Sequence, residues 1–208
     1  MGTNHMGRQS IRFPQPPVVR GFASVAGKKE REGPLGDQFT ATVQDTTFGE
    51  KSWERAERRM QQMTLELALE KAGLTDADLD AAFAGDLLNQ CIGSSFSLRN
   101  RGVPTLGLYG ACSTMAESLL LAAMSVSGGY ARTALAMTSS HFASSERQYR
   151  FPLGYGGQRT PTSQWTVTGA GAVLLGGGEC GIRITAATIG SSVDRGLCDA
   201  NNRGAAMA

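Results

Sequence analysis

The clearest hydrophobic pattern in the chain covers residues 53–72, where apolar side chains recur at steps of three and four positions. That spacing predicts an α-helix with one apolar face, formed by Trp53, Ala56, Met60, Met63 and Leu67. The charged residues between them predict a solvated opposite face, made of Glu54, Arg55, Glu57, Arg58 and Arg59. Ser52 is a candidate N-cap and Gly73 a candidate left-handed residue after the last turn.

Short apolar runs bounded by glycine, proline or polar residues predict the strands of a sheet. We expect these strands at residues 18–26, 81–87, 105–109, 133–138, 170–175 and 182–189. The last two are separated by the glycine-rich stretch 176–181 and are expected to pair as a hairpin in the same sheet. Further helices are expected at 94–100 and 112–128, and a long irregular loop at 139–168.

The predicted order alternates strands with helices before the long loop and the hairpin. Such alternation is typical of a mixed, mostly parallel sheet with helices on its faces, so the predicted fold class is α/β. Ligands of these sheets bind beyond the carboxyl ends of the strands. Asp86, Cys112 and the segment 139–141 end or directly follow three predicted strands, so we expect them to lie at one edge of the sheet.

Cys112 lies in the sequence Gly-Ala-Cys-Ser-Thr, between the strand at 105–109 and the helix that follows it. A thiol at a helix N-terminus is favoured as the reactive thiolate, which would suit a nucleophile in acyl chemistry. The same position can bind a carboxylate or an acyl oxygen. A third interpretation is a small residue buried between strand and helix.

Composition limits the other possibilities. The chain has 208 residues, of which 41% are hydrophobic and 18% charged, and this predicts one globular domain at 18–208 after a polar, flexible arm at 1–17. Its net charge of +2 gives no indication of a nucleic-acid partner, and none is expected. The four cysteines have no C-x-x-C spacing, so no metal site is expected, and Cys91, Cys180 and Cys198 are interpreted as structural. No cofactor is expected either, because neither glycine-rich stretch, 169–171 or 176–178, is followed by the lysine of a phosphate-binding loop. The longest apolar stretch, 119–126, is too short to span a bilayer, so the chain is expected to be soluble.

Several segments together resemble the thiolase/ketoacyl-synthase superfamily. They are the cysteine turn at 110–114, LTDADLD at 74–80 and GAGAVLL at 169–175. The resemblance implies a thiolase-like fold, of which this chain would form one βαβαβαββ half, the first of two. The acyl-transfer enzymes of the superfamily take a histidine or second cysteine from the other half, so Cys112 alone would be an incomplete catalytic set and the chain is expected not to be an enzyme.

A more specific resemblance is to the stage V sporulation protein AD family of endospore-forming bacteria. It rests on KEREGPLG at 29–36, AGDLLNQ at 84–90, LYGACST at 108–114, TSSH at 138–141, ERQ at 146–148 and TVTGAGA at 166–172. It implies non-enzymatic binding of dipicolinic acid during uptake into, or release from, the spore. It also implies membrane-protein partners of the same operon and a peripheral location on the spore inner membrane, at the outer face of the forespore.

Dipicolinic acid is a flat pyridine ring with two carboxylates, so its site needs cations or N–H donors at both ends and an apolar or aromatic wall. The segment 139–168 has a fitting composition. The candidate ligand-binding residues are Cys112, His141, Arg147, Arg150 and Tyr155. For each of them the alternative is an ordinary surface charge or core contact.

Two further functions stay open. In an acyl-transferring condensing enzyme, Cys112 would be the nucleophile and His141 would activate it, although His141 could equally bond a loop carbonyl. The second open function is that of a scaffold that only docks on membrane partners. The small residues of the helix at 112–128 predict close packing against an equivalent helix, so we expect either the missing half or a homodimer to cover it.

Overall fold

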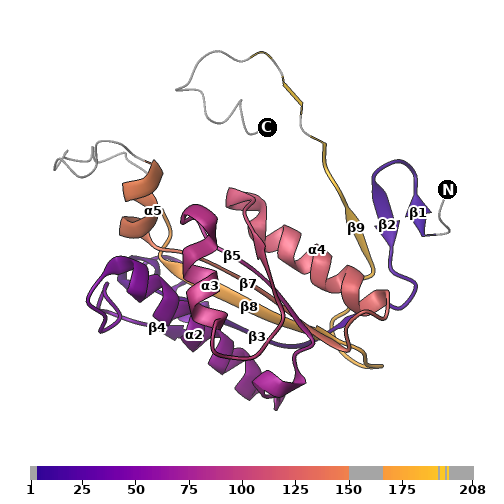
Figure 1. The fold of residues 1–208 in the computed structure, drawn as a ribbon, viewed down its shortest axis with the longest axis horizontal. Helices are drawn as coiled ribbons and strands as arrows, with labels where there is room; N and C mark the ends of the chain where they lie inside the picture. Colours follow the sequence, from indigo (N-terminus) through magenta and orange to yellow (C-terminus); the bar gives the residue numbers. More distant parts are fainter. Residues whose placement is uncertain (1–3, 150–165, 192, 195, 197–208) are drawn as a thin grey trace.

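Six strands form a central mixed sheet in the order β4-β3-β8-β7-β5-β6 (Figure 1). The structure is a computed structural model that describes residues 4–149, 166–191, 193–194 and 196. The strands are β3 (Val18–Ala26), β4 (Ala41–Thr42), β5 (Ala81–Gly85), β6 (Thr105–Leu108), β7 (Thr133–Ser140) and β8 (Gly169–Gly176). Strand β8 is antiparallel to both of its neighbours, β3 and β7, whereas β7, β5 and β6 are mutually parallel and β3 is parallel to β4. The α/β class and the mostly parallel sheet are therefore confirmed.

Helices cover both faces of this sheet (Figure 1). Helices α2 (Trp53–Ala72) and α3 (Ile92–Leu98) lie on one face, and α4 (Thr114–Ser127) lies on the other. The predicted bounds of α2 are correct because its ends carry strong signals. Arg55 N donates to the Ser52 hydroxyl at 3.3 Å, and Gly73 adopts the left-handed conformation with φ of 64°. The short helices α1 (Lys28–Arg31) and α5 (Phe142–Tyr149) follow the carboxyl ends of β3 and β7.

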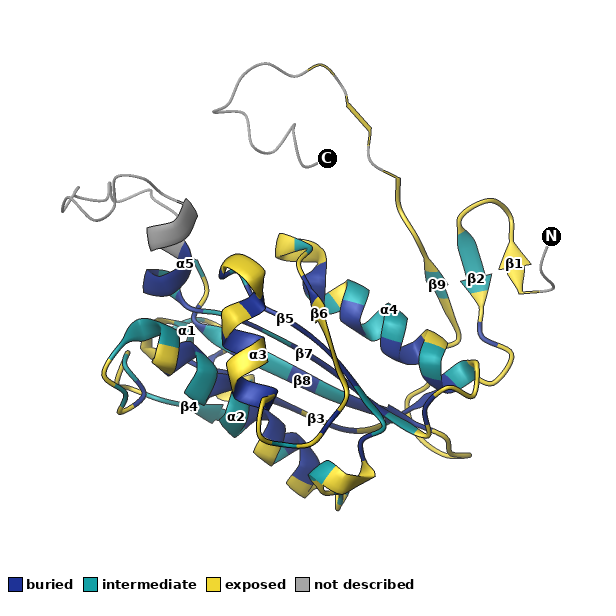
Figure 2. Ribbon diagram, in the orientation of Figure 1, coloured by how far each residue is buried: buried dark blue, intermediate teal, exposed yellow. Residues whose placement is uncertain are grey.

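The core consists of two apolar layers separated by the sheet, seen as dark blue along the strands in Figure 2. Strand β7 contributes to both layers because successive side chains alternate between faces. Leu135 and Met137 pack towards α2, whereas Ala134 and Ala136 pack towards α4. Helix α4 itself faces the sheet with small residues, including the fully buried Ala122 and Ala123, so this helix lies close to the sheet.

The predicted hairpin between 170–175 and 182–189 is wrong. Strand β8 already has β3 on one edge and β7 on the other, so no edge remains for the returning chain. Instead β9 (Ala186–Thr188) pairs with β2 (Ser10–Arg12), which pairs with β1 (His5–Met6), in a separate three-stranded sheet. The segment 1–17, expected to be a flexible arm, therefore contains two strands, and its Phe13 is buried in the core on the α4 side.

The predicted irregular loop at 139–168 is also different in the structure. Strand β7 continues to Ser140 and helix α5 follows it, because the apolar and hydroxyl residues after His141 pack against α2. Residues 150–165 lie outside the described part of the chain. The segment 38–49, for which the sequence predicts no element, contributes edge strand β4.

Candidate functional site

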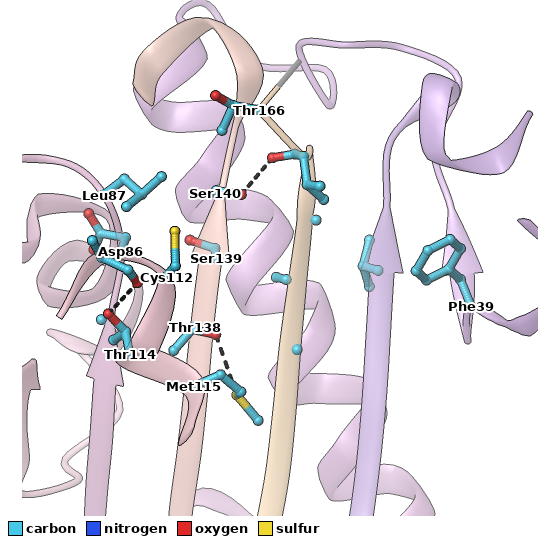
Figure 3. Close-up of a pocket in the computed structure, with 17 residues that line it drawn as sticks. Phe39, Asp86, Leu87, Cys112, Thr114, Met115, Thr138, Ser139, Ser140 and Thr166 are labelled. Atoms are coloured by element: carbon cyan, nitrogen blue, oxygen red, sulfur yellow. Dashed lines mark hydrogen bonds between the residues drawn. The ribbon is translucent and has the colours of Figure 1, made fainter. Parts of the chain in front are cut away.

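A pocket of about 560 Å³ lies at the carboxyl ends of β3, β5 and β7 and beside the start of β8 (Figure 3). This is the edge of the sheet at which the sequence predicts a ligand site. The lining residues are Val25, Phe39, Gly85, Asp86, Leu87, Ala111, Cys112, Thr114, Met115, Thr138, Ser139, Ser140, Thr166, Val167, Gly169, Ala170 and Gly171. The pocket thus combines an apolar wall with hydroxyl groups, one thiol and one carboxylate.

Cys112 lies where the sequence predicts it, in the turn between β6 and α4. The turn is the 3₁₀ helix Ala111–Ser113, and the Cys112 side chain is exposed. In Figure 3 its sulfur points along the direction of the strand ends, away from the sheet. Thr114 stabilises the turn from the helix side, since its hydroxyl donates to Ala111 O at 2.8 Å and accepts from Gly110 N at 3.1 Å. The exposed thiol excludes the interpretation of Cys112 as a small buried residue.

The backbone next to the pocket adopts conformations that are costly for residues other than glycine. Ala111 has φ of 48°, and in the β5–α3 connection Gln90 and Cys91 have φ of 59° and 54°. At the end of β5, a Cβ on Gly85 would lie 2.3 Å from Leu108 O, so only glycine fits there. Strain of this kind at a ligand-sized pocket supports a functional site, and sequence spacing alone gives no signal for it.

Asp86 orients the loop that leads from β5 to α3. Its Oδ1 accepts from Leu88 N at 2.9 Å, and its Oδ2 accepts from the backbone and the hydroxyl of Ser94, both at 2.7 Å. These bonds satisfy N–H groups in the loop and the first turn of the helix. Asp86 is nearly fully buried. Asp86 therefore holds the loop in place and caps the start of α3.

Glu57 differs from its predicted place on the solvated face of α2: it is 0% exposed. Its carboxylate accepts from the Ser139 hydroxyl at 2.8 Å and from the Ser144 hydroxyl at 2.6 Å. Burial raises the pKa of Glu57 to about 7, and the negative field of Asp86 adds to this. Because Ser139 lines the pocket, the carboxyl group lies directly behind the pocket wall.

The signal that could have placed Glu57 is the second stripe of α2. Glu57, Gln61 and Thr64 recur at steps of four and three residues, and all three are buried. They lie beside the apolar residues rather than opposite them. The prediction for Glu57 is wrong because a charged residue was taken to be exposed, whereas this one belongs to a buried polar stripe.

His141 is fully buried and is not among the pocket-lining residues. Its Nε2 bonds Thr46 O at 2.8 Å, and its Nδ1 accepts from Ala143 N at 3.2 Å. Burial lowers the pKa of His141, which favours the neutral ring. Both ring nitrogens are thus bonded to backbone groups, and the structure does not bring His141 and Cys112 together as a pair.

The other predicted ligand-binding residues lie beyond the described side chains. Arg147 belongs to α5, but its side chain is not described, and Arg150 and Tyr155 lie in the segment 150–165. The described lining residues include no lysine, arginine or histidine. Within the described part of the chain, no three His, Cys, Asp or Glu side chains are grouped as a metal site requires. Cys91 is buried and bonds Leu108 O, as expected for a structural thiol. Cys180 is exposed, so its interpretation as a structural residue is wrong, and Cys198 is outside the described residues.

Comparison with solved structures identifies the fold. The 3-oxoacyl-[acyl-carrier-protein] synthase III of Aquifex aeolicus superposes with a TM-score of 0.52 at 17% identity, over 79% of this chain and 55% of that one. OleA of Xanthomonas campestris gives a TM-score of 0.53 at 14% identity, over 80% of this chain and 57% of that one. At such low identity these relationships establish a thiolase-like fold and nothing of the activity.

Comparison with protein sequences is more specific. Stage V sporulation protein AD of Bacillus subtilis is 44% identical over 202 residues, which are 97% of this chain and 60% of the relative. The chain thus spans about 60% of the length of this relative. The profile of the family stage V sporulation protein AD (SpoVAD) matches residues 7–208. The chain therefore belongs to the stage V sporulation protein AD family.

Proposed function

We propose that this chain binds dipicolinic acid, without chemical conversion, in the pocket beside Cys112, and that this binding serves uptake of the acid into, or its release from, the spore. The single observation that carries the proposal is the pocket at the strand ends, whose lining lies within the part of the chain that matches the family, residues 7–208. A volume of about 560 Å³ accommodates a small aromatic acid.

The pocket wall has the mixed chemistry that a flat, doubly charged ring needs. Phe39, Val25 and Met115 supply apolar surface for the ring. The hydroxyl group of Thr138 lines the same space and can donate to a carboxylate oxygen. Charge-assisted bonds to the carboxylates would come from Arg147 and Arg150, with Tyr155 over the ring. These three residues follow Ser140 in the chain by 7, 10 and 15 positions, respectively.

The charge balance of the described wall makes these arginines necessary to the proposal. Among the described lining residues, Asp86 alone carries a charge, and this charge is negative. A dianion bound near it would be repelled unless cations compensate. We therefore propose that Arg147 and Arg150 bind the carboxylates of the ligand, because an arginine can bind a carboxylate through two parallel hydrogen bonds.

An acyl-transferring condensing enzyme is the second candidate, and the exposed thiol of Cys112 at a strained strand-to-helix turn favours it. Against it, both nitrogens of His141 are bonded to backbone groups, so His141 does not serve as the base that would activate the thiol. Labelling of Cys112 by an acyl-coenzyme A thioester would support the enzyme, and dipicolinate binding without such labelling supports the binder.

The proposed setting is the surface of the spore inner membrane, at the outer face of the forespore, with membrane proteins of the same operon as partners. Among the described residues, no helix has the length and apolar character needed to cross a bilayer. The proposed attachment is through partner proteins. We propose that the other half of the fold or a second copy of this chain covers α4, since Ala116 and Met124 are exposed along it.

The proposal predicts that removing either arginine weakens dipicolinate binding. Arg147→Ala and Arg150→Ala should each cost roughly 1.5–3 kcal/mol, about ten- to a hundred-fold in affinity, because each deletes a charge-assisted partner. Isothermal titration calorimetry on this chain, and on a full-length relative with matching changes, measures the effect. Arg8→Ala, in the exposed β1–β2 turn, is the matched control and should leave affinity unchanged. Undiminished binding by both variants would rule out the proposed grip.

A further inference from the structure

A buried chain of hydrogen bonds joins the pocket wall to Glu57. Gln61 Nε2 donates to Ser139 Oγ at 2.7 Å and to Ser94 Oγ at 3.1 Å, while Gln61 Oε1 accepts from the Ser97 hydroxyl. An amide nitrogen can only donate, so Ser139 and Ser94 must direct their own protons elsewhere. Ser139 donates to Glu57 at 2.8 Å. Gln61 therefore fixes the Ser139 hydroxyl as a donor to Glu57.

The hydrogen bond between the other oxygen of Glu57 and its partner, Ser144, can reverse its donor and acceptor. Glu57 Oε2 lies 2.6 Å from Ser144 Oγ, which also lies 3.4 Å from His141 O. When Glu57 is ionised, the Ser144 hydroxyl donates to Oε2. When Oε2 carries a proton, it can donate to Ser144 Oγ, and the Ser144 hydroxyl can turn to the carbonyl of His141. Both charge states of the carboxyl group thus have hydrogen-bond partners, and the Ser139 bond is the same in each.

The electrostatic surroundings of Glu57 favour exchange of this proton near neutral pH. The charged groups that act on it are acidic: Asp86, at the start of the β5–α3 loop, and Glu54, on α2 itself. Burial is the largest cause that raises the pKa of Glu57 to about 7; these two carboxylates add to it, and the hydrogen bonds from Ser144 and Ser139 act against it. His141, after β7, is buried and favours its neutral form.

The remaining elements packed on α2 add little charge. Strands β7 and β8 and helix α3 carry no titratable residue. Strand β3 carries Arg20, whose guanidinium donates to Gly177 O just beyond β8, at the opposite end of β3 from the pocket. The side chains of Glu146 and Arg147, in the second half of α5, lie outside the described residues.

We propose that Glu57 is a proton-linked control of the pocket's affinity for anions: an anionic ligand seated against Ser139 brings a proton onto Glu57, and loss of that proton promotes release. The inference rests on the proposed function, in which the ligand is a dicarboxylate. Its physical cause is repulsion between like charges across a buried hydroxyl, where little water screens them. By linkage, the factor by which protonation strengthens binding equals the factor by which the ligand favours protonation.

The test is the affinity for dipicolinate between about pH 6 and pH 8.5, measured by calorimetry in buffers of different ionisation enthalpy. The ligand's carboxyl groups are ionised throughout this range, so they contribute no slope. Wild-type affinity should fall about tenfold towards high pH, with proton uptake on binding; a tenfold change corresponds to a shift of about one unit in the pKa of Glu57 when the ligand binds. Glu57→Gln, which mimics the protonated acid, should bind at the low-pH affinity throughout. Glu70→Gln, exposed on the same helix, is the matched control and should keep the wild-type profile.

The outcomes separate the two proposals. Dipicolinate binding whose affinity does not change with pH, or a Glu57→Gln profile with the wild-type slope, would overturn the proton linkage and leave the proposed function standing. Absence of dipicolinate binding at every pH would overturn both. Ser144→Ala offers a second variant if Glu57→Gln does not fold. It removes a donor to the ionised carboxylate, so the midpoint of the profile should move to higher pH, and an unmoved midpoint would contradict the inference.

Discussion

Replacing Glu57 by glutamine should stabilise the protein at alkaline pH, and the gain should disappear in acid. The Glu57 carboxyl group is fully buried, and its pKa is raised from 4.5 to about 7. A raised pKa means that the folded state holds the proton more tightly than the unfolded state does. The stabilising contribution of the neutral acid is therefore complete below about pH 4.5 and is lost as pH rises through 7.

The expected size follows from the same shift. Between about pH 5 and pH 8.5, this one group should lower the free energy of unfolding by roughly 2–3 kcal/mol. Glutamine cannot ionise, and it can accept from Ser139 while donating to Ser144. Urea unfolding of wild type and Glu57→Gln at the two pH values measures the difference, with Glu70→Gln as control. A stability difference that does not depend on pH would show that Glu57 is not the titrating group.

A bulky side chain at Cys112 should abolish dipicolinate binding, whereas serine should preserve it. The Cys112 side chain is exposed within the pocket, and tryptophan there would occupy the volume proposed for the ring. Cys112→Trp should therefore weaken binding more than a hundred-fold, and Cys112→Ser should change it by only a few-fold, since the binding role requires no reaction at the thiol. Calorimetry measures both.

Cys180 offers a matched control for this pair. It is also exposed, but it is not among the pocket-lining residues, so Cys180→Trp should bind normally. The acyl-transfer alternative predicts a different pattern, because serine at Cys112 would abolish turnover of an acyl thioester. Dipicolinate binding that survives Cys112→Trp would place the ligand elsewhere on the protein.

Local signals predicted much of the fold. The residues 53–72 have both the helical period and clear end signals, and α2 has these bounds. The cysteine turn was also predictable, because a strand ends and a helix begins within a few residues of Cys112. Features that depend on which strand edges are still unpaired could not be predicted. The pattern of residues 182–189 predicts a strand, but the sequence does not show that both edges of β8 are already paired.

The candidate site shows the same division. Its position at the strand ends follows from the order of strands and helices, and Asp86 and Cys112 do line one pocket. Glu57 was misassigned because a charged residue on a helix is usually exposed, whereas its three-dimensional neighbours are the hydroxyls of Ser139 and Ser144. His141 was similarly placed near the site by sequence, but the carbonyl of Thr46, far away in the chain, fixes its ring.

The most direct test of the central claim is a crystal structure of this protein grown with dipicolinate. The account predicts that the pyridine ring lies between Cys112 and Ser139, with one carboxylate within hydrogen-bonding distance of the pocket hydroxyls and the other bound by Arg147 or Arg150. Dipicolinate bound at another surface, with the pocket beside Cys112 empty, would contradict it.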